Sequence, residues 1–281
     1  MATADVTLTS GMRNNLLQLQ ATSKLINRTQ ERLATGKKVN SALDNPTNFF
    51  AAQAALNRSS DLAIRKDGMA EGIQTAKAAD AGITAISALI EAAKGVGAAA
   101  LGTTSTTDRK VFGSQFNTLL SQVNYLASDS GYKGTNLLNG DTLTVNFNED
   151  GSSKLKVIGF SAIASTAATG LGISSATSAW SEATVTASNT TINADMAKLA
   201  TATSTLRTQS KTLAGNLNII TTRQDFTNAM ISTLQTGADN LTLADMNEEG
   251  ANMLMLQTRQ SLGTTALSLS SQAAQAVLRL F

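Results

Sequence analysis

Positions at alternating steps of three and four residues recur at both ends of the chain. A first row near the start holds Leu8, Met12, Asn15, Leu19, Thr22, Ile26, Thr29 and Leu33. A second row near the end holds Met253, Leu256, Gln260, Gly263, Leu267, Ser270, Ala274, Val277 and Phe281. This spacing places side chains on one helical face and is typical of helices packed lengthwise against each other. The sequence therefore predicts that the two ends form helices that pair.

The closing segment carries a third row beside the second. Its members are Ala251, Met255, Thr258, Leu262, Thr265, Leu269, Gln272 and Ala276. Two adjoining rows on one helix predict neighbours on more than one side. The first row mixes large apolar residues with Asn and Thr, so it gives an isolated helix little stability. We therefore interpret both ends as assembly elements that fold when they meet each other and neighbouring subunits. The alternative is two ordinary surface helices docked on a core.

Three further helices are predicted between the ends, the last two from the same spacing. One follows the capping signal Asp44-Asn45-Pro46 and runs over about 47–101. The next ends near 128–131, and the last extends over about 196–234. Gly36 is expected to close the first helix of the chain, and Gly95 and Gly97 to loosen the end of the second. A break is expected at 237–240.

The period falls to two in the middle of the chain. Leu143, Val145 and Phe147 alternate with polar residues, and Leu155 and Val157 do so after the turn sequence NEDGSS. This pattern predicts a β-hairpin. The following stretch, 161–190, is mostly Ser, Thr, Ala and Gly around Trp180. We interpret it as a surface segment with a further strand at 182–187.

Composition removes most catalytic chemistry. The 281 residues include no His, no Cys, one Pro and 4% aromatics, which excludes Ser-His-Asp, Cys-His and most zinc sites. The acidic group Asp245, Glu248 and Glu249 could in principle bind a hard cation, but it reads better as a charged first helical turn. We predict no catalytic, metal-binding or cofactor-binding residues, so the chain is not expected to be an enzyme.

Charge and hydropathy point to few partner classes. The net charge of +2 comes from scattered Lys and Arg, so neither nucleic acid nor an anionic membrane surface is an expected partner. No apolar run approaches the about 20 residues of a membrane span. The opening MATADVTLTS lacks the basic and apolar regions of a Sec-type signal peptide.

Three collinear motifs resemble the bacterial flagellin family. They are ERLATGKKVNSALDNPTNFFAAQ at 31–53, GYKGTNLLNG at 131–140 and LQTRQSLGTTALSLSSQAAQAVLRLF at 256–281. The resemblance covers about 1–140 and 190–281. It implies a mainly α fold, namely a long antiparallel coiled-coil helical rod with the N- and C-terminal helices paired and a small β-hairpin region in the middle of the chain.

The resemblance also implies a division of the chain. Residues 1–43 and 242–281 would form the inner, filament-core helices, and 44–140 and 190–241 the outer rod domain. Residues 141–189 would be the hairpin and a short variable surface segment, which makes this a minimal flagellin.

The function implied is that of a structural subunit that self-polymerises into the flagellar filament for swimming motility. The implied partners are other flagellin subunits, hook-associated proteins, the filament cap and an export chaperone. Export unfolded through the flagellar type III apparatus would place the chain outside the cell. The alternatives are a hook–filament junction protein and, from another class, a secreted coiled-coil adhesin.

The side chains predicted to form the assembly interface lie in the two terminal segments. They are Leu8, Leu19, Ile26, Leu33, Leu262, Leu267, Leu269, Val277, Leu280 and Phe281.

Overall fold

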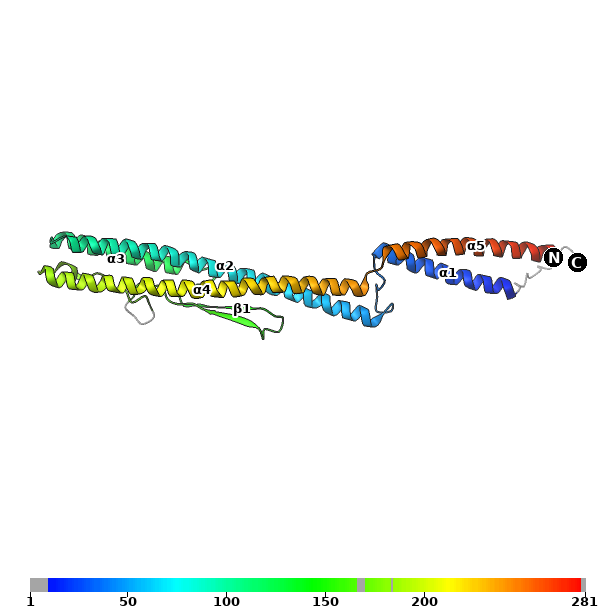
Figure 1. The fold of residues 1–281 in the computed structure, drawn as a ribbon, viewed down its shortest axis with the longest axis horizontal. Helices are drawn as coiled ribbons and strands as arrows, with labels where there is room; N and C mark the ends of the chain where they lie inside the picture. Colours follow the sequence, from blue (N-terminus) through cyan, green and yellow to red (C-terminus); the bar gives the residue numbers. More distant parts are fainter. Residues whose placement is uncertain (1–9, 166–169, 183, 279–281) are drawn as a thin grey trace, which may run out of the picture. The chain divides into compact units, whose positions relative to one another are not determined.

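The computed structural model describes residues 10–165, 170–182 and 184–278 (Figure 1). In chain order the elements are α1 (Ser10–Thr35), α2 (Pro46–Gly102), α3 (Thr106–Asp129), β1 (Thr142–Asn146), β2 (Lys154–Ile158), the 3-10 helix η1 (Ser178–Ser181), α4 (Val185–Thr242) and α5 (Met246–Leu278). The predicted mainly α fold with paired terminal helices and one hairpin is confirmed. The chain divides into two compact units. The first combines the chain up to Asn57 with the chain from Thr233 onward, and the second is Arg58–Ser232.

In the first unit, α1 and α5 pack side by side and antiparallel (Figure 1). The Nδ2 of Asn15 lies 3.5 Å from the carbonyl oxygen of Gly263, and the Nη1 of Arg32 lies 2.7 Å from the Oε1 of Glu249. The described members of the first row are all buried or half-buried, which confirms the predicted pairing. The row is diluted with Asn and Thr, yet Thr22 and Thr29 are buried as well as Ile26.

Two hydrogen-bonded links connect the terminal helices to α2 and α4. Helix α1 ends before Gly36, whose φ of +69° is a conformation that glycine adopts without strain. The amide of Lys38 donates to the carbonyl of Thr242 at 2.7 Å, and the amide of Ala244 donates to that of Gly36 at 3.0 Å. The segments entering and leaving the pair are therefore held side by side.

The restart of the chain into α2 follows the predicted capping signal. The side-chain oxygen of Asn45 accepts the amide of Asn48 at 3.1 Å, and Pro46 occupies the first helical position. Just before it, the carboxylate of Asp44 accepts the amides of Ser41 and Asn40 at 3.0 and 3.1 Å. These two hydrogen bonds hold the pKa of Asp44 below its usual value.

The core of the second unit lies between α2, α3 and α4. Its largest fully buried apolar side chains include Ile86 and Ile90 on α2, Phe116 on α3, and Leu199 and Leu206 on α4. Hydrophobic positions at helical spacing explain why these segments are helices, since each buries one face against the other two.

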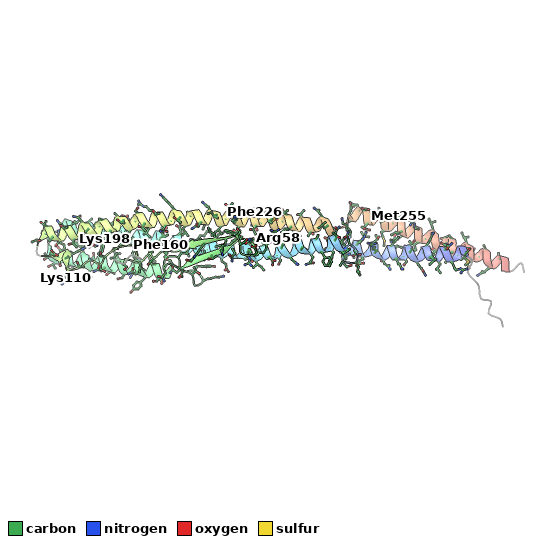
Figure 2. All side chains as sticks on the ribbon, turned by 90° about the horizontal axis from the view of Figure 1, so that it is seen from below. Arg58, Lys110, Phe160, Lys198, Phe226 and Met255 are labelled. Atoms are coloured by element: carbon green, nitrogen blue, oxygen red, sulfur yellow. The ribbon has the colours of Figure 1, made fainter. Side chains whose placement is uncertain are left out.

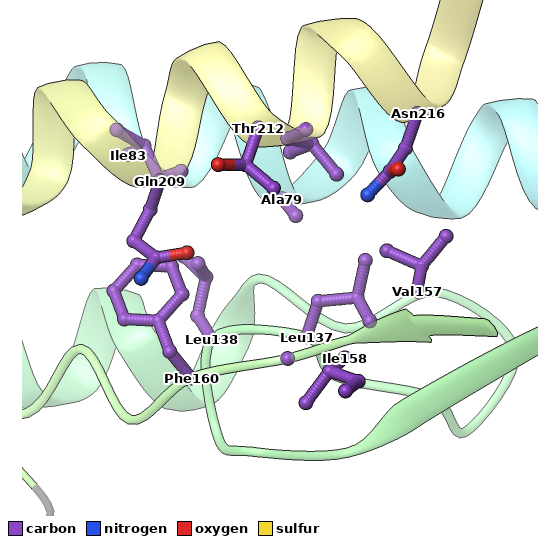
Figure 3. A pocket seen from close by; sticks show the side chains of 12 residues that line it. Ala79, Ile83, Leu137, Leu138, Val157, Ile158, Phe160, Gln209, Thr212 and Asn216 are labelled. Atoms are coloured by element: carbon purple, nitrogen blue, oxygen red, sulfur yellow. The ribbon is translucent and has the colours of Figure 1, made fainter. Parts of the chain in front are cut away.

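The hairpin closes one side of this unit. Strands β1 and β2 pair antiparallel, as the alternation predicted, and Val145 lies opposite Leu155. Val145 and Phe147 pack with Met69 of α2 and Ile220 of α4. Where the base of the hairpin meets α2 and α4, Figure 3 shows a small gap lined by side chains including Leu137 and Val157. Its volume of about 20 Å³ has room for a single water, so it is a packing gap and not a ligand site.

Trp180 corrects the interpretation of 161–190 as a plain surface segment. Its side chain is 1% exposed, its ring centroid lies 4.8 Å from that of Phe116, and its Nε1 donates to the Oδ2 of Asp195 at 2.9 Å. Asp195 also pairs with Lys198 at 3.1 Å. Leu171 and Ile173 of the same stretch are buried too, so part of this segment belongs to the core.

The strand predicted at 182–187 is wrong, because α4 already begins at Val185. The start of α4 is fixed by Arg109 of α3, which is 1% exposed. Its guanidinium donates to the carbonyls of Thr103 and Val185 at 2.8 and 3.3 Å and to the Oδ1 of Asn189 at 2.7 Å. A tertiary contact thus overrides the β propensity of a Val-Thr pair.

The break expected at 237–240 comes too early in the chain, and Gly95 and Gly97, expected to loosen the end of α2, do not interrupt it. Helix α4 continues through Gly237 to Thr242, and α2 continues through Gly95 and Gly97 to Gly102. A helical glycine costs about 1 kcal/mol relative to alanine, which packing readily offsets. Ala238 beside the first site, and Ala93 and Ala100 around the others, are buried.

Helix α2 also corrects the statement that no stretch approaches a membrane span. It contains an 18-residue window with a mean hydropathy of 1.4, which suffices by length and composition. Ile83, Ile86 and Ile90 of this helix are buried in the core of the second unit. The apolar side of the helix is thus used for packing against other helices.

Replacing Arg109 with Met is expected to lower the free energy of unfolding of the second unit by about 3 kcal/mol, because it removes three hydrogen bonds of a buried guanidinium to partly buried acceptors. The measurement is urea unfolding followed by far-ultraviolet circular dichroism. Arg109→Lys keeps the charge but cannot reach three acceptors, so it should fall between the wild type and Arg109→Met. A loss below about 1 kcal/mol for Arg109→Met would contradict the role of Arg109 in holding the start of α4.

Candidate assembly interface

The paired terminal helices leave several leucines uncovered. On α5, the third row faces outward, with Leu262 66% and Leu269 61% exposed, and Leu254 lies beside it. On α1, Leu17 is 62% exposed and Leu25 46%. We call these five residues, which lie on more than one uncovered side of the pair, the leucine face. Large apolar side chains exposed in this way mark interaction surfaces.

The predicted interface residues fall into two groups. Leu19, Ile26 and Leu33 lie on the first row and are buried or half-buried, and Leu267 is half-buried on the second row. These four belong to the faces along which α1 and α5 pair. Only two of the predicted residues, Leu262 and Leu269, are described and exposed.

The remaining predicted residues cannot be placed in either group. Leu8, Leu280 and Phe281 lie outside the described residues, as does the side chain of Val277.

Leu17, Leu25 and Leu254 were not predicted as interface residues. They are large apolar residues of the terminal helices that belong to none of the three rows. Their position outside the rows could have indicated an interface. A helix that pairs along one row does not need leucines on its other sides for that pairing.

Close approach of α1 and α5 depends on Gly263. A Cβ at this position would lie 2.9 Å from the Cδ2 of Leu19, closer than such atoms approach in proteins. The absence of a side chain at Gly263 lets the leucine of α1 lie against the backbone of α5. At Gly263, the second row thus leaves room for the side chain of Leu19. At Leu256, which is 5% exposed, the same row supplies an apolar side chain to the contact.

The end of α1 and the start of α5 border a polar crevice of about 280 Å³. The carboxylate of Glu249 is bound by Arg32, and the Oδ1 of Asp245 caps α5 by accepting the amides of Asn247 and Glu248 at 2.9 and 3.3 Å. These roles fit the predicted charged first turn. Over residues 10–165, 170–182 and 184–278 there is no cluster of acidic side chains placed to hold a metal ion.

Comparison with known proteins identifies the family. The bacterial flagellin N-terminal helical region matches residues 7–142. Flagellin FljO of Caulobacter vibrioides is 31% identical over 285 residues, which cover 100% of each chain. The chain belongs to the flagellin family. The flagellin of Brucella melitensis is 27% identical and is matched over 99% of both chains. A solved structure of Bacillus cereus flagellin matches 57% of this chain and 88% of its own, with a TM-score of 0.46 and 15% identity.

Family membership confirms the function implied by the three motifs. This flagellin is a structural subunit of the flagellar filament and serves motility. It self-assembles with other flagellin subunits and is not an enzyme. The leucine face is therefore a surface on a molecule whose function is to polymerise.

Proposed function

We propose that this flagellin polymerises by burying the leucine face of α1 and α5 between copies. The observation that carries the proposal is the exposure of Leu262 and Leu269 on a helix that is already paired along another face. Burying one leucine side chain contributes about 1.5–3 kcal/mol. The five leucines would together contribute on the order of 10 kcal/mol, which is comparable to the cost of association. Contacts outside the terminal helices are therefore needed as well.

The chain would divide between the filament core and its outer part as the motifs imply. Residues 1–43 and 242–281 would form the inner helices, 44–140 and 190–241 the outer domain, and 141–189 the hairpin and a connecting segment that is partly buried around Trp180. The paired links support these boundaries, because the amide of Lys38 and the carbonyl of Thr242 are hydrogen-bonded. Because the two links lie side by side, α1 ends and α5 begins at the same place.

The remaining partners are those that the resemblance to flagellins implies. We propose export unfolded through the flagellar type III apparatus to an extracellular filament, with an export chaperone, hook-associated proteins and the filament cap as partners. Before export, an exposed leucine face would favour aggregation, so the same face is a suitable surface for a chaperone to cover.

The test is the elongation of short sheared filament seeds by the purified chain, observed by electron microscopy. The full chain should extend the seeds into long tubes, and chains lacking 1–36 or 242–281 should not. A full chain that binds seeds but stops growth would indicate a hook–filament junction protein. A stable dimer or trimer that needs neither terminus would indicate an adhesin. Either result would overturn the proposal.

A further inference from the structure

The turn that leads into β1 contains the one Asn-Gly pair of the sequence, Asn139-Gly140. Asparagine is chemically labile, because the backbone nitrogen of the next residue can attack its side-chain carbonyl carbon and close a five-membered ring. A following glycine favours this attack, since it has no side chain to hinder the approach. Both residues are exposed, and Gly140 has a φ of +90°. Water and the two reacting groups therefore meet at this turn.

The fold does not hold the carboxamide of Asn139 in place. Within the described ranges, neither this carboxamide nor the amide of Gly140 forms a hydrogen bond. Asn136 of the same turn shows the contrast. Its Nδ2 donates to the carbonyls of Ala127 and Ser128 at 2.8 and 2.9 Å, so its carboxamide is fixed. The side chain of Asn139 is free to turn toward the nitrogen of Gly140.

A second pair that could form the same ring is protected. Asp150 precedes Gly151 in the turn of the hairpin, and its Oδ1 accepts the amide and the hydroxyl of Ser152 at 3.0 and 2.9 Å. These hydrogen bonds hold the pKa of Asp150 below its usual value. An ionised carboxylate is a poor target for an attacking nitrogen. Local structure thus blocks the reaction before Gly151 and permits it before Gly140.

We propose that Asn139 is a site of spontaneous deamidation in the folded chain. The nitrogen of Gly140 loses its proton and bonds to the Cγ of Asn139, and Nδ2 leaves with that proton as ammonia. One water then opens the ring at either of its two carbonyl carbons. One opening gives an aspartate at position 139. The other gives an isoaspartate, whose main chain runs through the former side chain and gains one carbon atom. Either product adds one negative charge.

The added carbon atom of the isoaspartate falls where the backbone is tightly packed. The amide of Phe160, which is labelled in Figure 2, donates to the carbonyl of Leu137 at 2.8 Å, and Figure 3 shows both side chains. A Cβ at Gly159 would lie 2.3 Å from the carbonyl oxygen of Asp141, so the two segments touch through their backbones. Lengthening the chain between Leu137 and Asp141 should therefore break the 2.9 Å hydrogen bond from the amide of Gly159 to the carbonyl of Asp141.

The test is incubation of the purified full chain for weeks at neutral pH in heavy-oxygen water, followed by mass spectrometry of its peptides. The peptide with position 139 should take up solvent oxygen about tenfold or more faster than the peptide with Asn148. The carboxamide of Asn148 is held by Ser152 and by the amide of Ser153. The rate at Asn139 in the folded chain should lie within about tenfold of the rate in urea.

Two variants at this exposed position serve as controls. Asn139→Gln would have to close a six-membered ring, so it should acquire no label at position 139. Asn139→Asp, freshly prepared, carries the added charge without the lengthened main chain. In the isoaspartate fraction of the aged wild type, the amide of Gly159 should exchange its hydrogen about tenfold or more faster than in the fresh chain. In Asn139→Asp it should exchange as in the fresh chain.

A chain that is labelled at position 139 in urea but not when folded would overturn the proposal, because the fold would then protect the site. Equal labelling at Asn139 and Asn148 in the folded chain would overturn it too. Unchanged exchange of the Gly159 amide in the isoaspartate fraction would contradict the proposed effect on the base of the hairpin.

Discussion

Replacing Leu269 with Asp is expected to abolish filament growth while leaving the monomer folded. The side chain is 61% exposed in the monomer, so an aspartate there meets water and costs the fold little. Between copies the same aspartate would lose the about 1.5–3 kcal/mol of a buried leucine and add the cost of burying an unpaired charge. We expect the critical concentration to rise by about 100-fold or more. The measurement is seeded elongation, with circular dichroism of the monomer.

Two companion variants separate polymerisation from helix pairing. Leu269→Met keeps the apolar volume and should polymerise within about threefold of wild type. Leu267→Asp changes a half-buried residue of the second row, so it should reduce the helix content of the monomer as well as prevent growth. Normal filaments from Leu269→Asp would show that the leucine face is not an interface.

Replacing Trp180 with Ala is expected to lower the free energy of unfolding of the second unit by about 3–5 kcal/mol. The substitution removes a ring in contact with Phe116 and the donor that binds Asp195. Asp195 would retain Lys198 as a partner, so the loss is mainly one of packing. The measurement is urea unfolding followed by circular dichroism, since Trp180 is the chain's one tryptophan.

Trp180→Phe is the matched control, because it keeps most of the apolar volume and loses the indole N–H. A loss of about 1–2 kcal/mol is expected. If Trp180→Ala unfolds like the wild type, the segment around it contributes nothing to the core.

The helices and the hairpin could be predicted because each leaves a local period. The first row predicted both α1 and the face that α5 covers, and the alternation around Val145 predicted the strands. The third row predicted a second face on α5, and Leu262 and Leu269 are exposed on it. Whether copies cover that face is an assembly property, which seeded growth tests.

The errors occurred where a distant contact decides the local structure. Val185 is favoured in a strand by its branched side chain, yet Arg109 holds its carbonyl at the start of α4. Trp180 stands among small polar residues, and only the position of Phe116 makes its site a core site. Gly237 by itself predicts that the helix ends there. Helix α4 continues, and the neighbouring Ala238 is buried. No period in the sequence carries this information.

The most direct test of the account is the reactivity of a cysteine at Leu262 before and after assembly. The chain has no cysteine, so Leu262→Cys introduces a single thiol that a maleimide can label. Ser175→Cys, at an exposed position in the segment proposed to face outward, is the control. The account predicts rapid labelling of both monomers, and in filaments labelling about tenfold or more slower at 262 alone. Equal labelling at 262 in monomer and filament would contradict the claim that copies polymerise through the leucine face.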